Sequence, residues 1–406
     1  MSINTVDIPK ADPPLRIALF SDSALPILNG VSISLDALIR GLRQRGHSAS
    51  LFTARAPGFA DPDPHTYRFF ALETPWTKDY PLALPPFYPM LRHFRAQKFD
   101  LIHTHTPFTL GFVGLRWAQS HGLPLVSTYH TLYDKYAHYI PYFPKRYVRY
   151  KIAKHTYFYY NQVDQVIVPS EAARKWIRRH SVRKPVTVIP TGIVRYPSGS
   201  PQDLRRSMGA SESSPVLLYV GRMAREKNLS TLLRGAAQVM QRIPGAVLWL
   251  VGDGPSRDEV VQMARDLGIG DRTRLVGFVP RAEVDRYYAA ADLFLFASTT
   301  ETQGLVVVEA MQYGLPAVVV QGGGAGAAVE DGVNGFLVRN DPEALAEAAG
   351  RCLEHPSLYA QLSAGAQATA ERFSVDAMVD QVIQVYREAL SPGSTPDLAR
   401  EVATQR

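Results

Sequence analysis

Cysteine and long apolar runs are scarce in this chain of 406 residues, and their scarcity excludes several classes of protein. The one cysteine, Cys352, cannot form an intrachain disulfide or a cysteine-based zinc site, and it favours a reducing compartment. No apolar run approaches the roughly 18 residues that a membrane-spanning helix needs. Residues 1–15 lack the apolar core of a secretory signal. We therefore expect a soluble or peripheral protein.

Compositional bias is absent as well. Glycine (29 residues) and proline (30 residues) lie near average usage, which excludes collagen-like and low-complexity chains. Hydrophobic residues make up 46% and charged residues 20%, which excludes an intrinsically disordered chain. At roughly 100–200 residues per domain, the length predicts two or three compact units.

The net charge of +7 is unevenly distributed. Residues 1–195 carry 25 Lys and Arg against 12 Asp and Glu, whereas the remainder carries 19 against 25. A basic half beside an acidic half predicts that only the first half faces an anionic partner.

Two series of short apolar runs alternate with helical periods. The first extends from Ile17–Phe20 to Val186–Ile189, and the second from Val216–Val220 to Gly335–Val338. Near-continuous apolar strands between helices are typical of parallel sheets that are covered on both faces. The sequence therefore predicts an α/β fold with two doubly wound, Rossmann-like domains facing across a cleft.

A turn-rich connector, Arg195–Pro201, marks the boundary between the two series. We predict domains over residues 1–195 and 196–375, and an amphipathic helix over 376–390 that packs back on the first domain. Residues 391–406 are expected to be disordered. Ligands of open α/β sheets bind beyond the carboxyl ends of the strands, so candidate functional residues are sought there.

Two glutamates with the spacing E-x7-E, Glu301 and Glu309, follow the strand Leu293–Phe296. A helix starting near Gly304 would place the first on the preceding loop and the second inside the helix. Carboxylates accept hydrogen bonds from hydroxyls, so the pair suits sugar and ribose. Backbone N–H groups at the helix start would make an anion site, at Gln303, Gly304 and Leu305. The alternative is two solvated glutamates flanking a helix start.

Two cations, Arg222 and Lys227, follow the strand Val216–Val220, where Gly221 lets the chain turn. A guanidinium fork and an ammonium point charge suit a diphosphate. The alternative is a charged loop with a local counter-ion.

Two shorter glycine signals, at Gly30 and at Gly252, lack the third glycine of a dinucleotide fingerprint. Each is also typical of a tight turn between a strand and a helix.

Histidines and aspartates offer further candidates. His130 ends a strand and would project into the cleft, where an imidazole can donate to a hydroxyl or share a proton. His103 and His105 share one strand face, but no third ligand has suitable spacing, so we expect no metal there. Asp61 and Asp63 resemble a metal-binding D-x-D motif, yet their proline-rich context favours a solvated turn.

Basic and aromatic residues interleave over residues 142–160, a pattern that suits the headgroup zone of an anionic bilayer. Each basic residue near such a surface contributes on the order of 1 kcal/mol. The residues that we expect at the membrane are Lys145, Arg146, Tyr147, Arg149, Tyr150, Lys151 and Lys154. The residues that extend the positive field are Arg174, Lys175, Arg178 and Arg179. The alternatives are an RNA-binding stripe or a solvated helix; because no recognisable nucleic-acid module is present, we expect no nucleic-acid partner.

Taken together, these motifs resemble the family-4 retaining glycosyltransferases of GT-B fold. The resemblance rests on Asn29-Gly30-Val31, Gly221-Arg222 with Lys227, Gly252-Asp253-Gly254-Pro255 and Glu301-x7-Glu309, and covers roughly residues 16–390. The stretches Asp22–Val31 and Tyr129–Tyr139 are similar to bacterial 1,2-diacylglycerol 3-glucosyltransferases, which make glycolipids at the cytoplasmic membrane face.

The resemblance implies roles for individual residues. Arg222 and Lys227 would hold the donor diphosphate, with the Gly30 amide nearby. Glu309 would bind the ribose hydroxyls and Glu301 the hydroxyls of the transferred hexose. The remaining donor contacts would come from Gly221, Gly252, Phe278 beside the base, and the amides of Gln303, Gly304 and Leu305.

His130 would lie near the anomeric carbon and the acceptor, so the catalytic set is His130, Glu301, Arg222 and Lys227. Residues 1–195 would face the acceptor and the membrane, and residues 196–375 would bind the nucleotide sugar. No cofactor and no essential metal are expected. The chain departs from the family after Gly322-Gly323-Gly324, where Ala325 stands in place of a commonly acidic residue.

The sequence thus predicts a retaining hexosyltransferase at the inner face of the cell membrane. It would move a hexose, glucose by the resemblance, from UDP-glucose to a lipid such as diacylglycerol. The alternatives are a GDP-mannose-dependent mannosyltransferase, a UDP-galactose-dependent galactosyltransferase, a nucleotide-sugar epimerase or hydrolase, and a non-catalytic membrane or RNA-binding protein.

Overall fold

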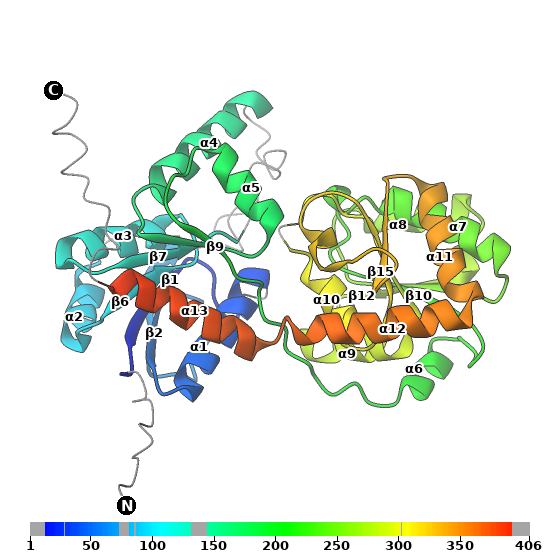
Figure 1. Ribbon diagram of the computed structural model, residues 1–406, viewed down its shortest axis with the longest axis horizontal. Coiled ribbons are helices and arrows are strands. Elements are labelled where there is room, and N and C mark those ends of the chain that lie inside the picture. The colour runs from blue at the N-terminus through cyan, green and yellow to red at the C-terminus, as the bar shows by residue number, and fades with distance from the viewer. Residues whose placement is uncertain are drawn as a thin grey trace, which may run out of the picture. The chain divides into compact units, whose positions relative to one another are not determined.

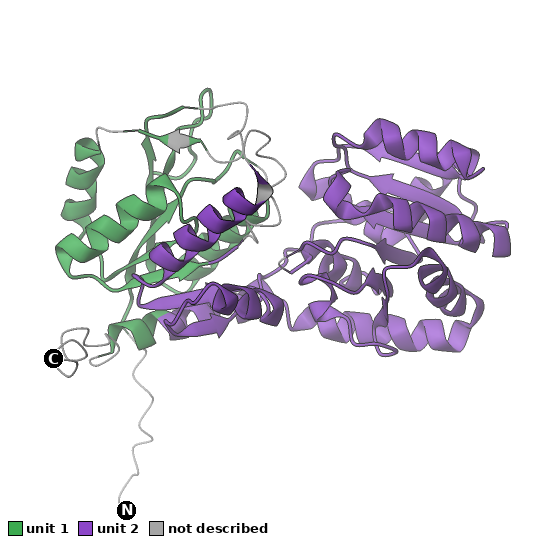
Figure 2. Cartoon of the chain, turned by 90° about the horizontal axis from the view of Figure 1, so that it is seen from above, with its two compact units in different colours: residues 1–128, 386–406 green, residues 129–385 purple. Residues whose placement is uncertain are grey.

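A computed structural model describes residues 13–27, 29–72, 81–84, 87–130, 144–301 and 303–391, with backbone only at residues 82 and 145. The chain divides into two compact units, residues 1–128 with 386–406, and residues 129–385 (Figure 2). The predictions for residues 131–139 of the Tyr129–Tyr139 stretch, for the Lys145 side chain and for residues 392–406 lie outside the described part.

A seven-stranded sheet has the order β3-β2-β1-β6-β7-β8-β9. The strand bounds are β1 (Arg16–Ser21), β2 (Ser48–Ala54), β3 (Thr66–Phe69), β6 (Leu101–Thr104), β7 (Leu125–Thr128), β8 (Gln165–Val168) and β9 (Val186–Val188). Pairings among β3, β2, β1, β6 and β7, and between β8 and β9, are parallel. The short strands β4 (Ala71–Leu72) and β5 (Leu82–Ala83) form a separate antiparallel pair.

Helices connect these strands (Figure 1). Their bounds are α1 (Gly30–Gln44), α2 (Tyr88–Gln97), α3 (Thr109–His121), α4 (Lys145–Tyr160) and α5 (Glu171–Arg179). Helix α1 begins at Gly30 because the Asn29 side chain accepts hydrogen bonds from the backbone N–H groups of Val31 and Ser32, both at 3.0 Å.

Aromatic rings fill the core of the first unit. Phe20 of β1 and Phe52 of β2 stack with their ring centroids 4.8 Å apart, and Trp117 of α3 meets both edge-on. All three side chains are buried. Such large apolar surfaces supply most of the burial energy that fixes α3 over the sheet.

A six-stranded, fully parallel sheet has the order β12-β11-β10-β13-β14-β15. Its strands are β10 (Val216–Val220), β11 (Val247–Val251), β12 (Thr273–Gly277), β13 (Leu293–Phe296), β14 (Ala317–Val320) and β15 (Gly335–Val338). The strand order reverses between β10 and β13, which is where a doubly wound sheet opens a crevice at its carboxyl edge. The two parallel sheets confirm the predicted fold class.

Helices cover both faces of this second sheet (Figure 1). Their bounds are α6 (Pro201–Ser207), α7 (Leu229–Arg242), α8 (Arg257–Asp266), α9 (Arg281–Ala290), α10 (Leu305–Met311), α11 (Pro342–Glu354) and α12 (Pro356–Glu371). Helices α7 and α11 pack together on one side, and α10 packs against α9 and α12 on the other. The strands between them are buried on both faces, including Trp249, Phe294 and Phe296.

Two segments of chain cross beside each other before the last helix, α13 (Val375–Leu390). The Ile193 N–H donates to the Phe373 carbonyl at 2.9 Å, and the Gly192 N–H donates to Met378 Sδ at 3.1 Å. A Cβ on Gly192 would lie 2.6 Å from Val375 Cα, so only glycine fits this crossing. Further along α13, the Tyr386 hydroxyl lies 2.7 Å from His103 Nδ1 in the first unit.

Candidate functional site

Glycines bring two loops into direct contact at the carboxyl edge of the second sheet. The Gly221 N–H donates to the Val251 carbonyl at 2.9 Å, and the Met223 N–H donates to the Asp253 carbonyl at 2.9 Å. A Cβ on Gly252 would lie 2.0 Å from the Gly221 carbonyl oxygen, with φ at 131°. Side chains are therefore excluded at Gly252, and the backbones after β10 and β11 can pack together.

Lys227 and Glu301 form an ion pair between the loops that follow β10 and β13. The ammonium contacts Glu301 Oε1, and the Ser298 hydroxyl donates to the same oxygen at 3.2 Å. Both charged side chains are largely buried, at 15% and 18% exposed. One predicted diphosphate cation and one predicted hexose-binding carboxylate thus share a single location.

Arg222 lies on the same loop as Lys227 and is exposed. Its carbonyl accepts a hydrogen bond at 3.0 Å from the hydroxyl of Tyr219, a buried residue of β10. Burial, with the negative charge of Glu301 adding to it, raises the pKa of Tyr219, so this phenol stays a neutral donor. The Tyr219 hydroxyl therefore fixes the turn from which Arg222 projects.

Glu309 lies inside α10, as predicted, and its carboxylate is held by two residues of α9. Arg281 Nη2 lies 3.3 Å from Glu309 Oε1, and the Tyr288 hydroxyl donates to Oε2 at 2.9 Å. Burial raises the pKa of Glu309, and the Arg281 guanidinium opposes that shift. Arg281 and Tyr288 are not among the residues predicted from the sequence, although their spacing of seven places them on one face of α9.

Arg281 also holds the connector that follows the first sheet. Arg281 pairs with Asp285 one turn along α9 and donates to the Val194 carbonyl at 3.1 Å. Asp285 is fully buried and accepts from the Tyr196 backbone N–H at 2.7 Å and from the Tyr313 hydroxyl at 2.8 Å. Glu309 and the connector thus belong to one buried polar network.

Glu301 and Gly304, which precede α10, are held by backbone packing. Gly304 has φ at 71°, and a Cβ there would lie 2.7 Å from Ala325 Cα. The Gly324 N–H donates to the Glu301 carbonyl at 2.5 Å. Gln303 is buried and Leu305 is the first residue of α10, so the loop reaches the helix start that the sequence predicts. The triplet Gly322–Gly324 therefore packs closely against Thr299 and Glu301.

Phe278 follows β12 and is 70% exposed at the same carboxyl edge. Gly277 and Gly252 form an isolated bridge, with the Gly252 N–H donating to the Gly277 carbonyl at 2.8 Å. Since Gly277 has φ at 82°, the chain turns sharply and leaves the aromatic ring in solvent. An exposed ring at this position suits stacking against a planar base.

Gly30 and His130 are the predicted donor-binding and catalytic residues in the N-terminal half of the chain. Gly30 is exposed as the first residue of α1, and Asp22 at the end of β1 is buried, where it accepts from the Leu110 N–H at 3.0 Å. His130 is half-buried after β7, and burial lowers its pKa to about 4. Its imidazole is therefore neutral at physiological pH, which suits accepting a hydrogen bond from a hydroxyl.

The two remaining motifs are engaged in structural contacts. Asp61 pairs with Arg68, 2.7 Å from its Nε, and Asp63 pairs with Arg43 at 2.8 Å. His103 bonds the Thr128 hydroxyl through Nε2 at 2.7 Å, while its ring packs against that of His105. In the part of the chain that is described, no three His, Cys, Asp or Glu side chains gather as a metal site would require.

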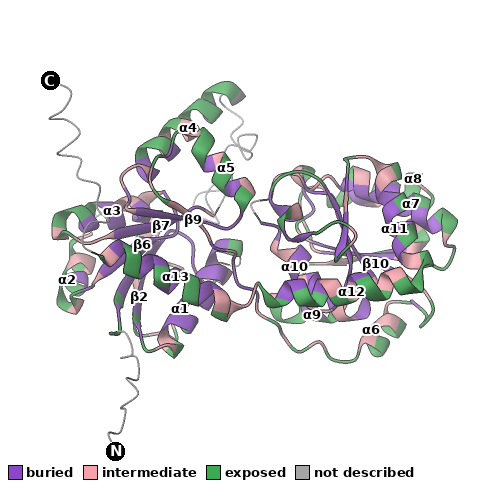
Figure 3. Ribbon diagram, in the orientation of Figure 1, coloured by how far each residue is buried: buried purple, intermediate pink, exposed green. Residues whose placement is uncertain are grey.

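Much of α4 and α5 is exposed to solvent (Figure 3), and the predicted basic and aromatic residues with described side chains lie on their exposed parts. On α4, Tyr147 and Tyr150 are 48% and 61% exposed, while Val148 is buried. The exposed cations of α4 are Arg146, Arg149, Lys151 and Lys154. On α5, four cations line one surface hollow of about 600 Å³, namely Arg174, Lys175, Arg178 and Arg179.

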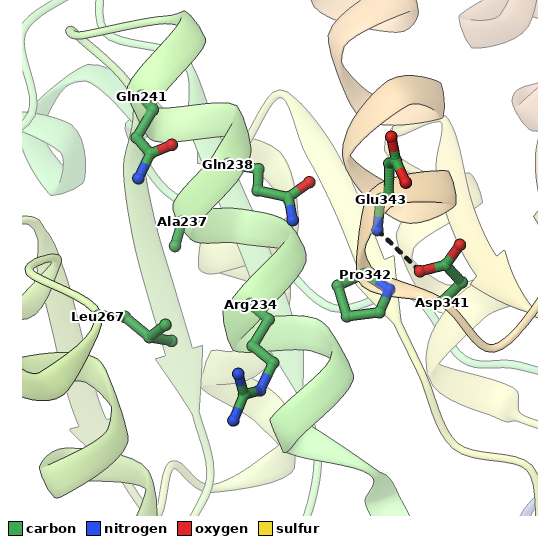
Figure 4. Close-up of a pocket in the computed structure, with 8 residues that line it drawn as sticks. All are labelled: Arg234, Ala237, Gln238, Gln241, Leu267, Asp341, Pro342 and Glu343. Carbon is green, nitrogen blue, oxygen red and sulfur yellow. Dashed lines mark hydrogen bonds between the residues drawn. The ribbon is translucent and has the colours of Figure 1, made fainter.

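A second hollow of about 510 Å³ lies between α7 and the start of α11 (Figure 4). Arg234 and Gln238 of α7 line it together with Asp341 and Glu343, and Asp341 caps α11 by accepting from the Glu343 N–H at 3.2 Å. None of the predicted donor residues lines it. No helix among the described residues is both long and apolar enough to cross a bilayer.

Comparison with known proteins finds two family matches, one in each half of the chain. Residues 28–194 match Glycosyltransferase Family 4, and residues 201–369 match glycosyl transferases group 1. An alpha-monoglucosyldiacylglycerol synthase of Streptococcus pneumoniae is 32% identical over 323 residues, covering 75% of this chain and 70% of the relative. One from Acholeplasma laidlawii is 30% identical over 389 residues, covering 93% and 98%.

Among solved structures, Anabaena HepE in complex with UDP-glucose has a TM-score of 0.71 at 26% sequence identity. The match covers 92% of this chain and all of that one. These findings confirm the family resemblance and the predicted enzyme class.

Proposed function

The chain belongs to the family-4 glycosyltransferases of GT-B fold, and on that basis we propose that it transfers glucose from UDP-glucose to diacylglycerol with retention at the anomeric carbon. Two relatives at about one third identity are named as alpha-monoglucosyldiacylglycerol synthases, which supports the acceptor. A structural relative is solved with UDP-glucose, which supports the donor.

The observation that carries the proposal is the pairing of Lys227 with Glu301 at the carboxyl edge of the second sheet. In the proposed reaction the C–O bond between the anomeric carbon and the diphosphate breaks while negative charge grows on the departing diphosphate. The acceptor hydroxyl forms the new bond on the same face of the sugar and passes its proton to the departing diphosphate. Lys227 and Arg222 stabilise that charge, and Glu301 holds hydroxyls of the hexose. Because both Lys227 and Glu301 are mostly shielded from water, each charge acts more strongly than it would at the surface.

The proposed acceptor enters from the membrane, and α4 and α5 carry the surface that would bind it. Exposed tyrosines beside exposed cations suit the headgroup zone of an anionic bilayer. The enzyme is then peripheral at the inner face of the cell membrane. No cofactor beyond the nucleotide sugar and no essential metal are proposed.

A donor panel tests the reaction. The purified chain is incubated with radiolabelled UDP-glucose, UDP-galactose or GDP-mannose and with vesicles containing diacylglycerol. We expect label in the lipid phase with UDP-glucose, and an α-linked product by proton NMR. If only GDP-mannose or UDP-galactose gives labelled lipid, UDP-glucose is not the donor. If label enters only lipids other than diacylglycerol, diacylglycerol is not the acceptor.

Vesicle sedimentation tests the membrane surface. A variant with the four α5 cations changed to Gln should bind anionic vesicles more weakly than the wild type, and added salt should release the wild type because surface attraction is screened. The matched control changes four exposed cations of the second sheet's helices to Gln, namely Arg234, Arg257, Arg265 and Arg286. Equal losses in the two variants would refute a role for this surface.

A further inference from the structure

The Gln303 side chain makes two hydrogen bonds to the backbone of a distant residue. Gln303 Oε1 accepts from the Thr191 N–H at 2.9 Å, and Gln303 Nε2 donates to the Thr191 carbonyl at 3.4 Å. Gln303 is 4% exposed and Thr191 is 8% exposed. The carboxamide therefore pairs with the N–H and the carbonyl of one residue inside the protein, as a residue on a neighbouring antiparallel strand would.

Thr191 belongs to a fixed part of the backbone. It precedes Gly192 and Ile193, which cross the segment 373–375 with a backbone hydrogen bond and a glycine-only approach. A loop attached to Thr191 is consequently attached to a point that has little freedom to move.

Gln303 lies two residues after Glu301 and immediately before the glycine that opens α10. The Glu301 backbone is held from the other side by Gly324, and a Cβ on Gly323 would lie 2.8 Å from the Glu301 carbonyl oxygen. The loop that carries Glu301 is thus held by backbone contacts at Glu301 and by one buried side chain at Gln303.

We propose that Gln303 is a positioning residue for sugar transfer: its bonds to Thr191 hold the loop so that Glu301 faces the donor hexose. The inference rests on the proposed function, because it takes from it the role of Glu301. It assigns to Gln303 no contact with the substrate through its side chain. The sequence suggested a backbone contact to the donor at this residue, and the structure gives its side chain a separate task.

An amide suits this task because it presents one acceptor and one donor side by side, complementary to the N–H and the carbonyl of Thr191. Met at position 303 would have a similar volume but would leave the N–H and carbonyl of Thr191 without these partners. Glu at position 303 would accept from the N–H, but as a carboxylate it could not donate to the carbonyl. When protonated, Glu regains the donor.

Binding of UDP-glucose and of UDP by calorimetry tests the proposal in three proteins, wild type, Gln303→Met and Gln262→Met. Gln262 is a glutamine of α8 whose amide bonds Asp266 at the surface, and it serves as the matched control. We expect Gln303→Met to weaken UDP-glucose about tenfold and to leave UDP unchanged, since loss of a buried hydrogen-bonding partner is worth about a factor of ten. Equal weakening of both ligands would mean general damage and would overturn the proposal.

Gln303→Glu supplies a readout that a merely structural residue would not give. Its kcat/KM relative to wild type should rise as the pH falls from 8 to 5.5, because protonation restores the donor to Thr191. Dividing by the wild-type value at each pH removes the pH dependence that the two proteins share. A ratio that does not change with pH would overturn the proposal.

The two failures are distinguishable. If the wild type binds UDP-glucose and Gln303→Met binds it equally well, only the positioning role fails. If the wild type binds no nucleotide sugar, the proposed function fails and the positioning role fails with it.

Discussion

Replacing Arg281 by Met removes the cation shared by two buried carboxylates, and we expect a large loss of stability. The side chains of Glu309 and Asp285 are 12% and 0% exposed, and the Arg281 side chain is 16% exposed. Water therefore screens these pairs poorly. Breaking a buried ion pair from one side costs about 3–5 kcal/mol, because the remaining charge stays buried without its partner.

The sign of the pH dependence follows from Glu309. Burial already raises its pKa, and Arg281 opposes that rise, so removal of Arg281 should raise the pKa further. A raised pKa means that the folded protein favours the protonated acid. The stability deficit of Arg281→Met should therefore be largest at pH 8 and should shrink as the pH falls toward the ordinary carboxyl value.

Urea unfolding followed by circular dichroism at pH 8 and pH 5.5 measures both effects. The matched control is Arg339→Met, because Arg339 pairs with Asp341 at 2.8 Å while its side chain is 74% exposed; it should cost at most about 1 kcal/mol. Arg281→Met combined with Glu309→Gln should recover part of the loss. A deficit no greater than that of Arg339→Met, or one that is the same at both pH values, would refute this reasoning.

Three further predictions concern the site and its surroundings. Gly304→Ala should destabilise the fold by about 1–3 kcal/mol and weaken donor binding, because Gly304 has a positive φ and no room for a Cβ. The control Gly245→Ala, where a Cβ would meet nothing within 4 Å, should change neither thermal unfolding nor UDP-glucose binding by calorimetry. Lys227→Met should lower the transfer rate at saturating donor by about 10²–10³-fold, and a wild-type rate would remove Lys227 from the diphosphate site. Burial lowers the pKa of His130 to about 4, against an ordinary value near 6.5. Protonation therefore favours the unfolded chain, and acidification from pH 6.5 toward pH 4 should lower the free energy of unfolding by up to about 3 kcal/mol. His130→Gln should therefore unfold less steeply with falling pH than the wild type, whereas the exposed His355→Gln should follow the wild-type curve.

The family and the fold could be read from the sequence because both depend on local patterns. Apolar strands alternating with helices predict two doubly wound sheets, and α10 begins at Leu305, directly after the glycine at which the spacing of Glu301 and Glu309 places the helix start. Helix α1 begins at Gly30, where the Asn29 side chain caps a first turn that already contains the buried Val31.

The sequence alone determined the cysteine content, the charge distribution and the order of the motifs that follow the strands, because none of these depends on which loops are in contact. Only the tertiary structure decided the partners of the site residues. Lys227 pairs with Glu301, 74 residues further along the chain, and Gln303 bonds Thr191, 112 residues before it. Glu309 pairs with Arg281 of another helix. A sequence pattern repeats along one strand or helix and says which face is buried. Contacts between the loops of a parallel sheet depend instead on strand order and on how closely the backbones approach, which here is set by glycines at Gly192, Gly252 and Gly304.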